Sequence, residues 1–164
     1  MSQDKLFYDL SKQSQDHLRQ GKLGMYACDL YSMSEVNRKE KMYDKQLYSL
    51  TISAYIHLSG VDTLEDYSYW KNGDFSVTRP RPLLPPAVVR NLSTCTKKLS
   101  MSIEQYEEFY FDVIEPTLTP AHVFGIKGTW DIIHAYLNGE DQKAEKLIAG
   151  GTKKFIKDLS RKGR

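Results

Sequence analysis

Apolar residues recur every three or four positions along most of the chain, and this spacing places them on one side of an α-helix. Over residues 3–20, Leu6, Leu10 and Leu18 follow the pattern, while the charged residues lie mostly on the other sides. We therefore predict a first helix in this range, ended by the glycines that follow it.

The stretch from Met25 to Ser59 contains neither glycine nor proline. It carries two apolar stripes separated by the polar segment 37–41. Because no helix-breaking residue is present, we favour one long, bent helix over two helices that separate near Asn37. We expect Leu47, Leu50 and Ala54 of the second stripe to be buried and Arg38, Lys39 and Lys41 to be exposed. That second stripe consists of Tyr43, Leu47, Leu50, Ala54 and Leu58.

Residues 67–78 carry the clearest strand signal. Asn72-Gly73 tolerates the positive φ angles of a type I′ turn, and aromatic, partly alternating residues flank it. We predict a small β-hairpin here, and a loop whose rings cover helix ends is the alternative. The prolines of 79–86 then forbid a helix and favour an extended crossover.

The second half of the chain predicts a series of shorter helices. Pro86 suits the first position of one helix, and Ser102 with Gln105 forms a capping box that opens the next. We expect Thr129 to cap a further helix and Gly150-Gly151 to break the last one.

These elements predict a mainly α-helical protein. We expect an irregular bundle of about six helices, with one long helix in the N-terminal half and at most one small β-hairpin. The length of 164 residues suits one domain over 1–164. Its parts are a helical hairpin with a long second helix (1–60), the β-hairpin and proline-rich crossover (61–86), shorter helices (87–152) and a basic C-terminal tail (153–164).

Composition narrows the class of protein further. The 40% hydrophobic and 27% charged content is typical of a globular chain. No apolar run approaches the roughly 20 residues that span a bilayer, and the N-terminus lacks the apolar segment of a secretory signal. We expect a cytoplasmic protein without membrane association. Cys28 and Cys95 do not form a disulfide framework, and both are predicted to be buried thiols.

The chemistry-bearing residues form no recognisable catalytic or nucleotide-binding motif. Asp131 and His134 share one side of a predicted helix, but a single pair is too small a metal-ligand set. We therefore predict no metal and no cofactor. The acids of 104–115 interleave with aromatic residues, which indicates a solvated helix face; a patch for a basic partner is the functional alternative.

The net charge of +2 hides an asymmetry. From Lys143 to Arg164 there are eight basic residues and two acids, a net charge of +6, so residues 1–142 carry −4. A basic tail can contact nucleic-acid phosphates or serve solubility alone. The candidate phosphate contacts are Lys153, Lys154, Lys157, Arg161, Lys162 and Arg164.

Three classes of function remain, and we favour a non-enzymatic helical interaction module: an adaptor, assembly factor or regulator. It would bind another protein or a second copy of itself through an aromatic and basic surface. The alternatives are a nucleic-acid-associated protein that uses the basic tail and an enzyme whose site is assembled from scattered residues. The residues of the candidate partner surface are Tyr67, Tyr69, Trp70, Phe75, Arg79 and Arg81.

Overall fold

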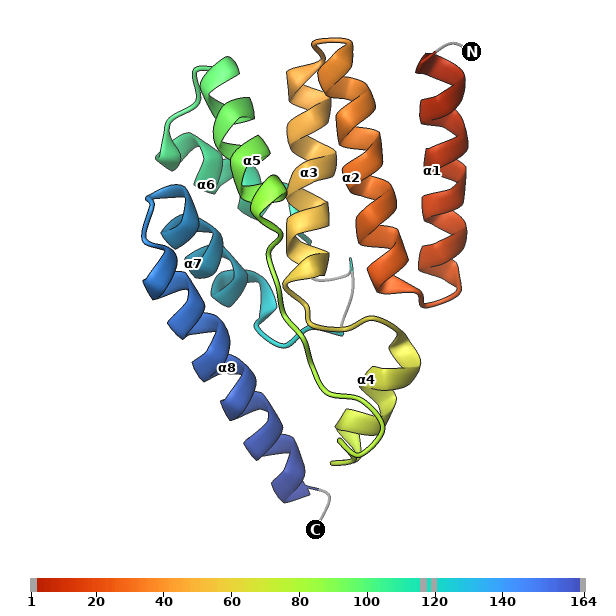
Figure 1. Cartoon of the computed structure of the whole chain (residues 1–164), viewed down its shortest axis with the longest axis vertical. Coiled ribbons are helices and arrows are strands. Elements are labelled where there is room, and N and C mark those ends of the chain that lie inside the picture. Colours follow the sequence, from red (N-terminus) through yellow and green to blue (C-terminus); the bar gives the residue numbers. More distant parts are fainter. Residues whose placement is uncertain (1–2, 116–117, 119–120, 163–164) are drawn as a thin grey trace.

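The computed structural model describes residues 3–115, 118 and 121–162, and these residues form eight α-helices and no β-strand (Figure 1). The mainly helical class is therefore confirmed, with more helices than the six predicted. The helices are α1 (Gln3–Arg19), α2 (Leu23–Lys39), α3 (Tyr43–His57), α4 (Leu64–Lys71), α5 (Pro86–Lys98), α6 (Ile103–Val113), α7 (Gly125–Leu137) and α8 (Asp141–Lys162). Within this part of the chain, no helix combines the length and the apolar character needed to cross a membrane.

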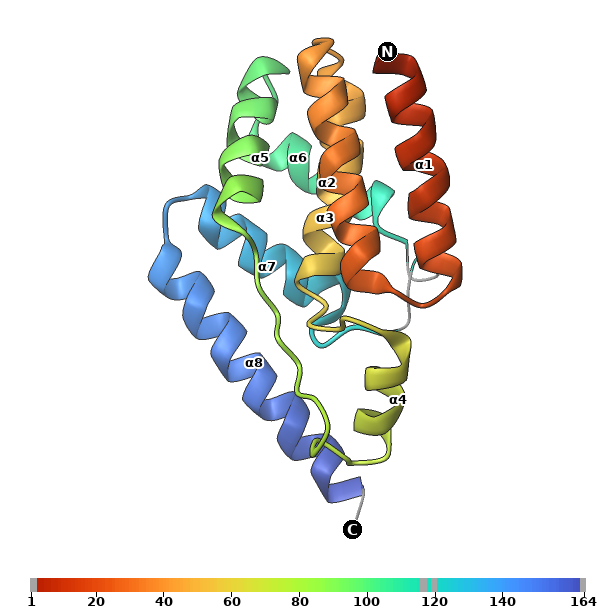
Figure 2. The same cartoon turned by 45° about the vertical axis from the view of Figure 1, so that its right-hand side comes forward.

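Helix α3 is the centre of the molecule. It packs against α2, α5 and α6, while α1 covers the far side of α2 (Figures 1 and 2). As predicted, Leu47, Leu50 and Ala54 are completely buried. Because α3 has neighbours on several sides, its small polar residues are buried too, and each needs a partner. The Ser53 hydroxyl donates to the Ala27 carbonyl at 2.7 Å, for example.

The long helix predicted over 25–59 is in fact two antiparallel helices. Helix α2 ends at Lys39, and Lys41 adopts a left-handed φ of 60°. The Lys41 N–H donates to the Arg38 carbonyl at 3.0 Å and the Met42 N–H to the Asn37 carbonyl at 2.9 Å. This pair of bonds is a Schellman motif, which usually places glycine where Lys41 stands. The polar segment therefore contains the last residues of α2 and the turn after it, and its basic side chains are exposed as expected.

The predicted β-hairpin is absent from the described residues, because 64–71 forms helix α4. The Thr63 hydroxyl accepts a hydrogen bond from the Asp66 N–H and caps the start of this helix. Asn72 and Gly73 end it, with Gly73 at φ 80°, so the Asn-Gly pair closes a helix and does not connect two strands. The proline-rich segment then crosses to α5 without regular secondary structure, as predicted.

In the C-terminal half, two predicted helix starts are confirmed and two other predictions are wrong. Helix α5 begins at Pro86, and the capping box of Ser102 and Gln105 is complete. Thr129 lies inside α7, where its hydroxyl donates to the Gly125 carbonyl, so it is not a cap. The Gly150-Gly151 pair lies inside α8, which continues without a break to Lys162.

The basic tail is consequently part of a 22-residue helix packed on the body. Phe155 carries the contact, because its ring centroid lies 6.5 Å from that of Tyr67 and 6.4 Å from that of Trp70. This contact joins the C-terminal end of α8 to α4, as the two views of the backbone also show (Figures 1 and 2).

Candidate functional site

The predicted aromatic surface is divided between the core and the exterior. Trp70 and Phe75 are buried, with exposed fractions of 1% and 9%, and their rings stack with centroids 6.3 Å apart. The Trp70 indole N–H donates to the Thr78 carbonyl at 3.0 Å, so its polar atom is satisfied inside the protein. Tyr67 is half-buried against α8, whereas Tyr69 lies at the surface, where its hydroxyl bonds to Glu65.

Arg79 and Arg81 are exposed and belong to the extended segment 74–85, which we call the strap. They line a cavity of about 620 Å³ between the strap, the end of α3 and α4. Asp62 and Asp66 line the same cavity, and buried Trp70 is also part of its wall.

A second cavity of about 460 Å³ adjoins the first and extends toward α1. The two share three lining residues, Gly24, His57 and Asp62, so they adjoin, and we call them together the strap groove. Backbone bonds set its centre: the Gly24 N–H donates to the Asp62 carbonyl at 3.0 Å, and the Leu64 N–H donates to the Gly21 carbonyl at 2.9 Å. These bonds hold the chain around Asp62 against the start of α2.

At the α1 end of the groove, His17 and Asp29 form a close pair. His17 Nδ1 lies 2.5 Å from Asp29 Oδ2, and the Gln13 side-chain amide donates to Asp29 Oδ1 at 2.8 Å. Asp29 is 6% exposed, so this buried carboxylate is satisfied from α1 on both of its oxygens.

Cys28 and His57, which also line the groove, have shifted pKa values. Burial lowers the pKa of His57, so this imidazole is neutral at neutral pH. Cys28 is exposed but partly desolvated by its neighbours, and this desolvation, followed by the charges of Asp29 and Asp62, raises the pKa of its thiol. A thiol that keeps its proton is a poor nucleophile and a poor metal ligand. The prediction that Cys28 is buried is wrong, because its residue is exposed; Cys95 is buried as predicted.

The remaining titratable residues make local contacts. His134 stacks on Trp130 and bonds to Asn138, while Asp131 faces Lys127 at 3.5 Å. Asp131 and His134 therefore have different partners despite their helical spacing. Over residues 3–115, 118 and 121–162, no group of three or more His, Cys, Asp or Glu residues is arranged to hold a metal ion. The acidic residues of α6 point to solvent; these are Glu104, Glu107, Glu108 and Asp112.

The basic residues of α8 form a second candidate surface. Lys153, Lys154, Lys157 and Arg161 are exposed, while the apolar residues between them are half-buried toward the body. The side chain of Lys162 and the whole of Arg164 lie outside the described residues.

No protein-family model, curated protein or solved structure matches the chain in our comparisons. The fold and the sites themselves define it as an all-α protein with a groove of charged and apolar side chains at one end of its central helices.

Sequence reasoning located Arg79 and Arg81 but missed the groove they border. Its walls come from α1, from the start of α2 and from residues 57–66, which lie far apart along the chain. His17 and Asp29 are 12 positions apart on different helices, and no motif spacing joins them. The short loop 60–63 between two helices was the one local signal, since its Gly60 and Asp62 are typical loop residues.

Proposed function

We propose that the protein is a non-enzymatic helical interaction module and that the strap groove holds a segment of a partner protein. The adjacency of the two cavities, which share Gly24, His57 and Asp62, carries this proposal. A depression that runs from the strap across the start of α2 to α1 suits an extended peptide segment better than a compact molecule. Specific recognition needs polar groups on the walls, and both signs of charge are present here.

The strap is a stiff rim for such a groove. Pro80 and Pro82 have no backbone N–H, and the N–H groups between and after them bond to the bundle: Arg81 to the Gly60 carbonyl at 3.1 Å and Leu83 to the His57 carbonyl at 3.4 Å. Pro82 also packs directly on Gly60, where an added Cβ would lie 2.8 Å from the proline Cγ.

Two consequences for binding follow from this geometry. Over 80–83, every backbone N–H is either absent or already bonded, so this part of the strap offers no N–H donor for strand addition. A partner must therefore be recognised through the exposed side chains of Arg79, Arg81 and Leu83. Because the rim is fixed before binding, little conformational entropy is lost when a partner binds.

The charges on the two walls indicate what kind of segment fits. The arginines of the strap suit carboxylates, which a guanidinium binds through two parallel hydrogen bonds. Asp62 and Asp66, which line the same cavity, suit basic side chains. We therefore expect a partner segment that carries both acidic and basic residues. The raised pKa of Cys28 favours binding over nucleophilic catalysis at this site.

The test is purification of the full-length chain from its native host, with and without nuclease. Reversing two charges in Arg79→Glu/Arg81→Glu should release the specific partner. Arg90→Glu is the matched control, because Arg90 is exposed on α5 and does not line the groove. A protein retained by the wild type and the control, resistant to nuclease and lost from the double variant, supports the proposal. Equal retention by all three chains contradicts it.

A nucleic-acid-associated function is the second candidate, favoured by the continuity of α8. One helix projects Lys153, Lys157 and Arg161 at four-residue intervals on the side away from its apolar contacts. Truncation would also remove Phe155 from Trp70, so charge substitution is the cleaner test. Replacing the three residues by Gln should abolish gel-shift binding, and the wild-type affinity should fall by about 0.9 log units per phosphate contact for each log unit of salt.

A further inference from the structure

Another cavity, separate from the strap groove, lies at the opposite end of α2 and α3. It has a volume of about 350 Å³ and opens between the α2–α3 turn and α5. We call it the turn cavity. Four cationic side chains from two separate segments line it: Arg38, Lys39 and Lys41 at the α2–α3 turn, and Lys98 on α5.

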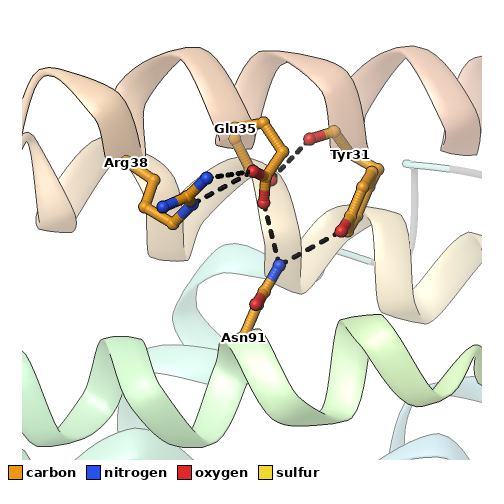
Figure 3. Close-up of polar contacts among 5 residues, drawn as sticks. Tyr31, Glu35, Arg38 and Asn91 are labelled. Carbon is orange, nitrogen blue, oxygen red and sulfur yellow. Dashed lines mark hydrogen bonds and ion pairs between the residues drawn. The ribbon is translucent and has the colours of Figure 1, made fainter.

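Most of this positive charge is uncompensated. The Arg38 guanidinium bonds to Glu35 Oε2 at 2.7 and 3.0 Å, and the Asn91 amide bridges Glu35 Oε1 to the Tyr31 hydroxyl (Figure 3). That network neutralises Arg38. In contrast, none of the three lysine ammonium groups forms an ion pair with a residue that the structure describes.

Negative charge also lies near the turn cavity, at Glu40 between Lys39 and Lys41 in the sequence and at Asp44. Burial, together with the charge of Asp44, raises the pKa of the Cys95 thiol to about 11. Cys95 lines the cavity, so Asp44 offsets part of the field of the three lysines but not all of it. A small multivalent anion would bring these ammonium groups together favourably.

Gln46 adds a polar group without a partner. This residue lines the turn cavity and is 2% exposed, yet its Oε1 atom has no hydrogen-bond partner among the described residues. A buried polar atom without a partner costs roughly 1–3 kcal/mol. The Oε1 atom itself is enclosed by protein, and an acceptor oxygen does not bind a phosphate oxygen, so Gln46 contributes to the wall of the cavity and not to recognition of the anion.

Lys41 is also held in a conformation that disfavours it. Its φ of 60° lies in the left-handed region, where a side chain costs roughly 1–2 kcal/mol relative to glycine. Basic residues in the last turn of a helix are explained by the helix dipole, and this accounts for Lys39 and Lys98. It does not account for Lys41, which lies beyond the helix end in the position that glycine usually fills.

We propose that the turn cavity binds a small phosphorylated molecule. The three ammonium groups would surround the phosphate, and the organic part would lie against the half-buried Tyr43 ring and the Gln46 amide. The volume exceeds the needs of a bare phosphate and matches the lower range of small-molecule sites. Free phosphate presents the same anionic chemistry, so the test includes both sources.

Isothermal titration in phosphate-free, low-salt buffer tests the proposal, with inorganic phosphate, pyrophosphate and phenyl phosphate as probes. Lys41→Gly removes one ammonium group and relieves the left-handed strain, so this variant should be more stable and yet bind about tenfold more weakly. Lys98→Gln should weaken binding similarly. Lys45→Gln is the matched control, because Lys45 is exposed on α3 and does not line the cavity.

The expected result is saturable one-site binding that weakens in the two cavity variants and is unchanged in the control. Tighter binding of phenyl phosphate than of inorganic phosphate identifies an organic phosphate as the ligand, and equal affinities identify the free anion. Absence of saturable binding at millimolar concentrations of all three probes overturns the proposal. So does an equal loss of affinity in Lys45→Gln.

Discussion

Two adjacent glycines in α8 should respond in opposite directions to the same substitution. A Cβ added at Gly150 meets nothing within 4 Å, whereas one added at Gly151 would overlap the ring of Phe124, with Cδ1 at 2.8 Å. Ala is favoured over Gly in a helix interior by about 1 kcal/mol, and this gain applies to both positions. Overpacking at Gly151 costs roughly 1–3 kcal/mol in addition. The helix-propensity gain cancels between the two variants, so the difference in their unfolding free energies measures the overpacking alone.

We therefore expect Gly150→Ala to stabilise the protein by about 1 kcal/mol. The Gly151→Ala variant should be less stable than the Gly150→Ala variant by roughly 1–3 kcal/mol. Urea unfolding gives both free energies, and the melting temperatures should differ by about 2–4 °C per kcal/mol. Equal stabilisation by both substitutions would show that Phe124 does not pack on Gly151. Destabilisation by Gly150→Ala would show that the helix breaks at the glycine pair. The basic tail would then be a segment separate from α8.

Three further substitutions test the core, a buried histidine and a helix cap. Leu50→Ala should cost roughly 2–5 kcal/mol in thermal unfolding, since Leu50 is completely buried in α3; an unchanged melting temperature would contradict its place there. Burial lowers the pKa of His122 from 6.5 to about 4, so the unfolded chain takes up the proton first and roughly 3 kcal/mol of stability is lost as the pH falls from about 6.5 to about 4. His122→Gln should flatten this part of the stability curve, and an unaltered slope would exclude His122 as its source. Ser102→Ala should cost about 1 kcal/mol in urea unfolding through the lost capping box, and no change would show that the cap is dispensable.

The helices were predictable where their signals are local. The capping box at Ser102, the proline at the start of α5 and the periodic stripe of α3 each have a physical reason within a few residues. The turn after α2 has no such signal, because its left-handed residue is Lys41 instead of glycine. The N–H groups of Lys41 and of the residue after it bond to the end of α2 in the same pattern as those of Gly21 and Gly139 and the residues after them. The motif is therefore the same, and only the residue in the left-handed position differs.

Other features needed tertiary information. An Asn-Gly pair suits both a type I′ turn and a helix end, and the packing of Trp70 against Phe75 and Phe155 decides for the helix end in this chain. Likewise, Gly151 lies inside the continuous helix α8, where the absence of a side chain leaves room for the ring of Phe124. This packing role of the glycine cannot be read from its neighbours in the sequence. The strap groove depends on contacts between distant segments, so the sequence indicated its arginines but not its acids.

Site-specific photo-crosslinking in the native host tests the interaction proposal most directly. A photoreactive amino acid at position 83 replaces Leu83, which is 61% exposed and lines the strap groove. The same amino acid at position 48 replaces Tyr48, which is 52% exposed on α3 and does not line the groove. We predict a discrete protein adduct from position 83 that is absent from position 48 and disappears in the Arg79→Glu/Arg81→Glu background. No adduct from position 83, or the same adducts from both positions, would contradict a partner in the strap groove.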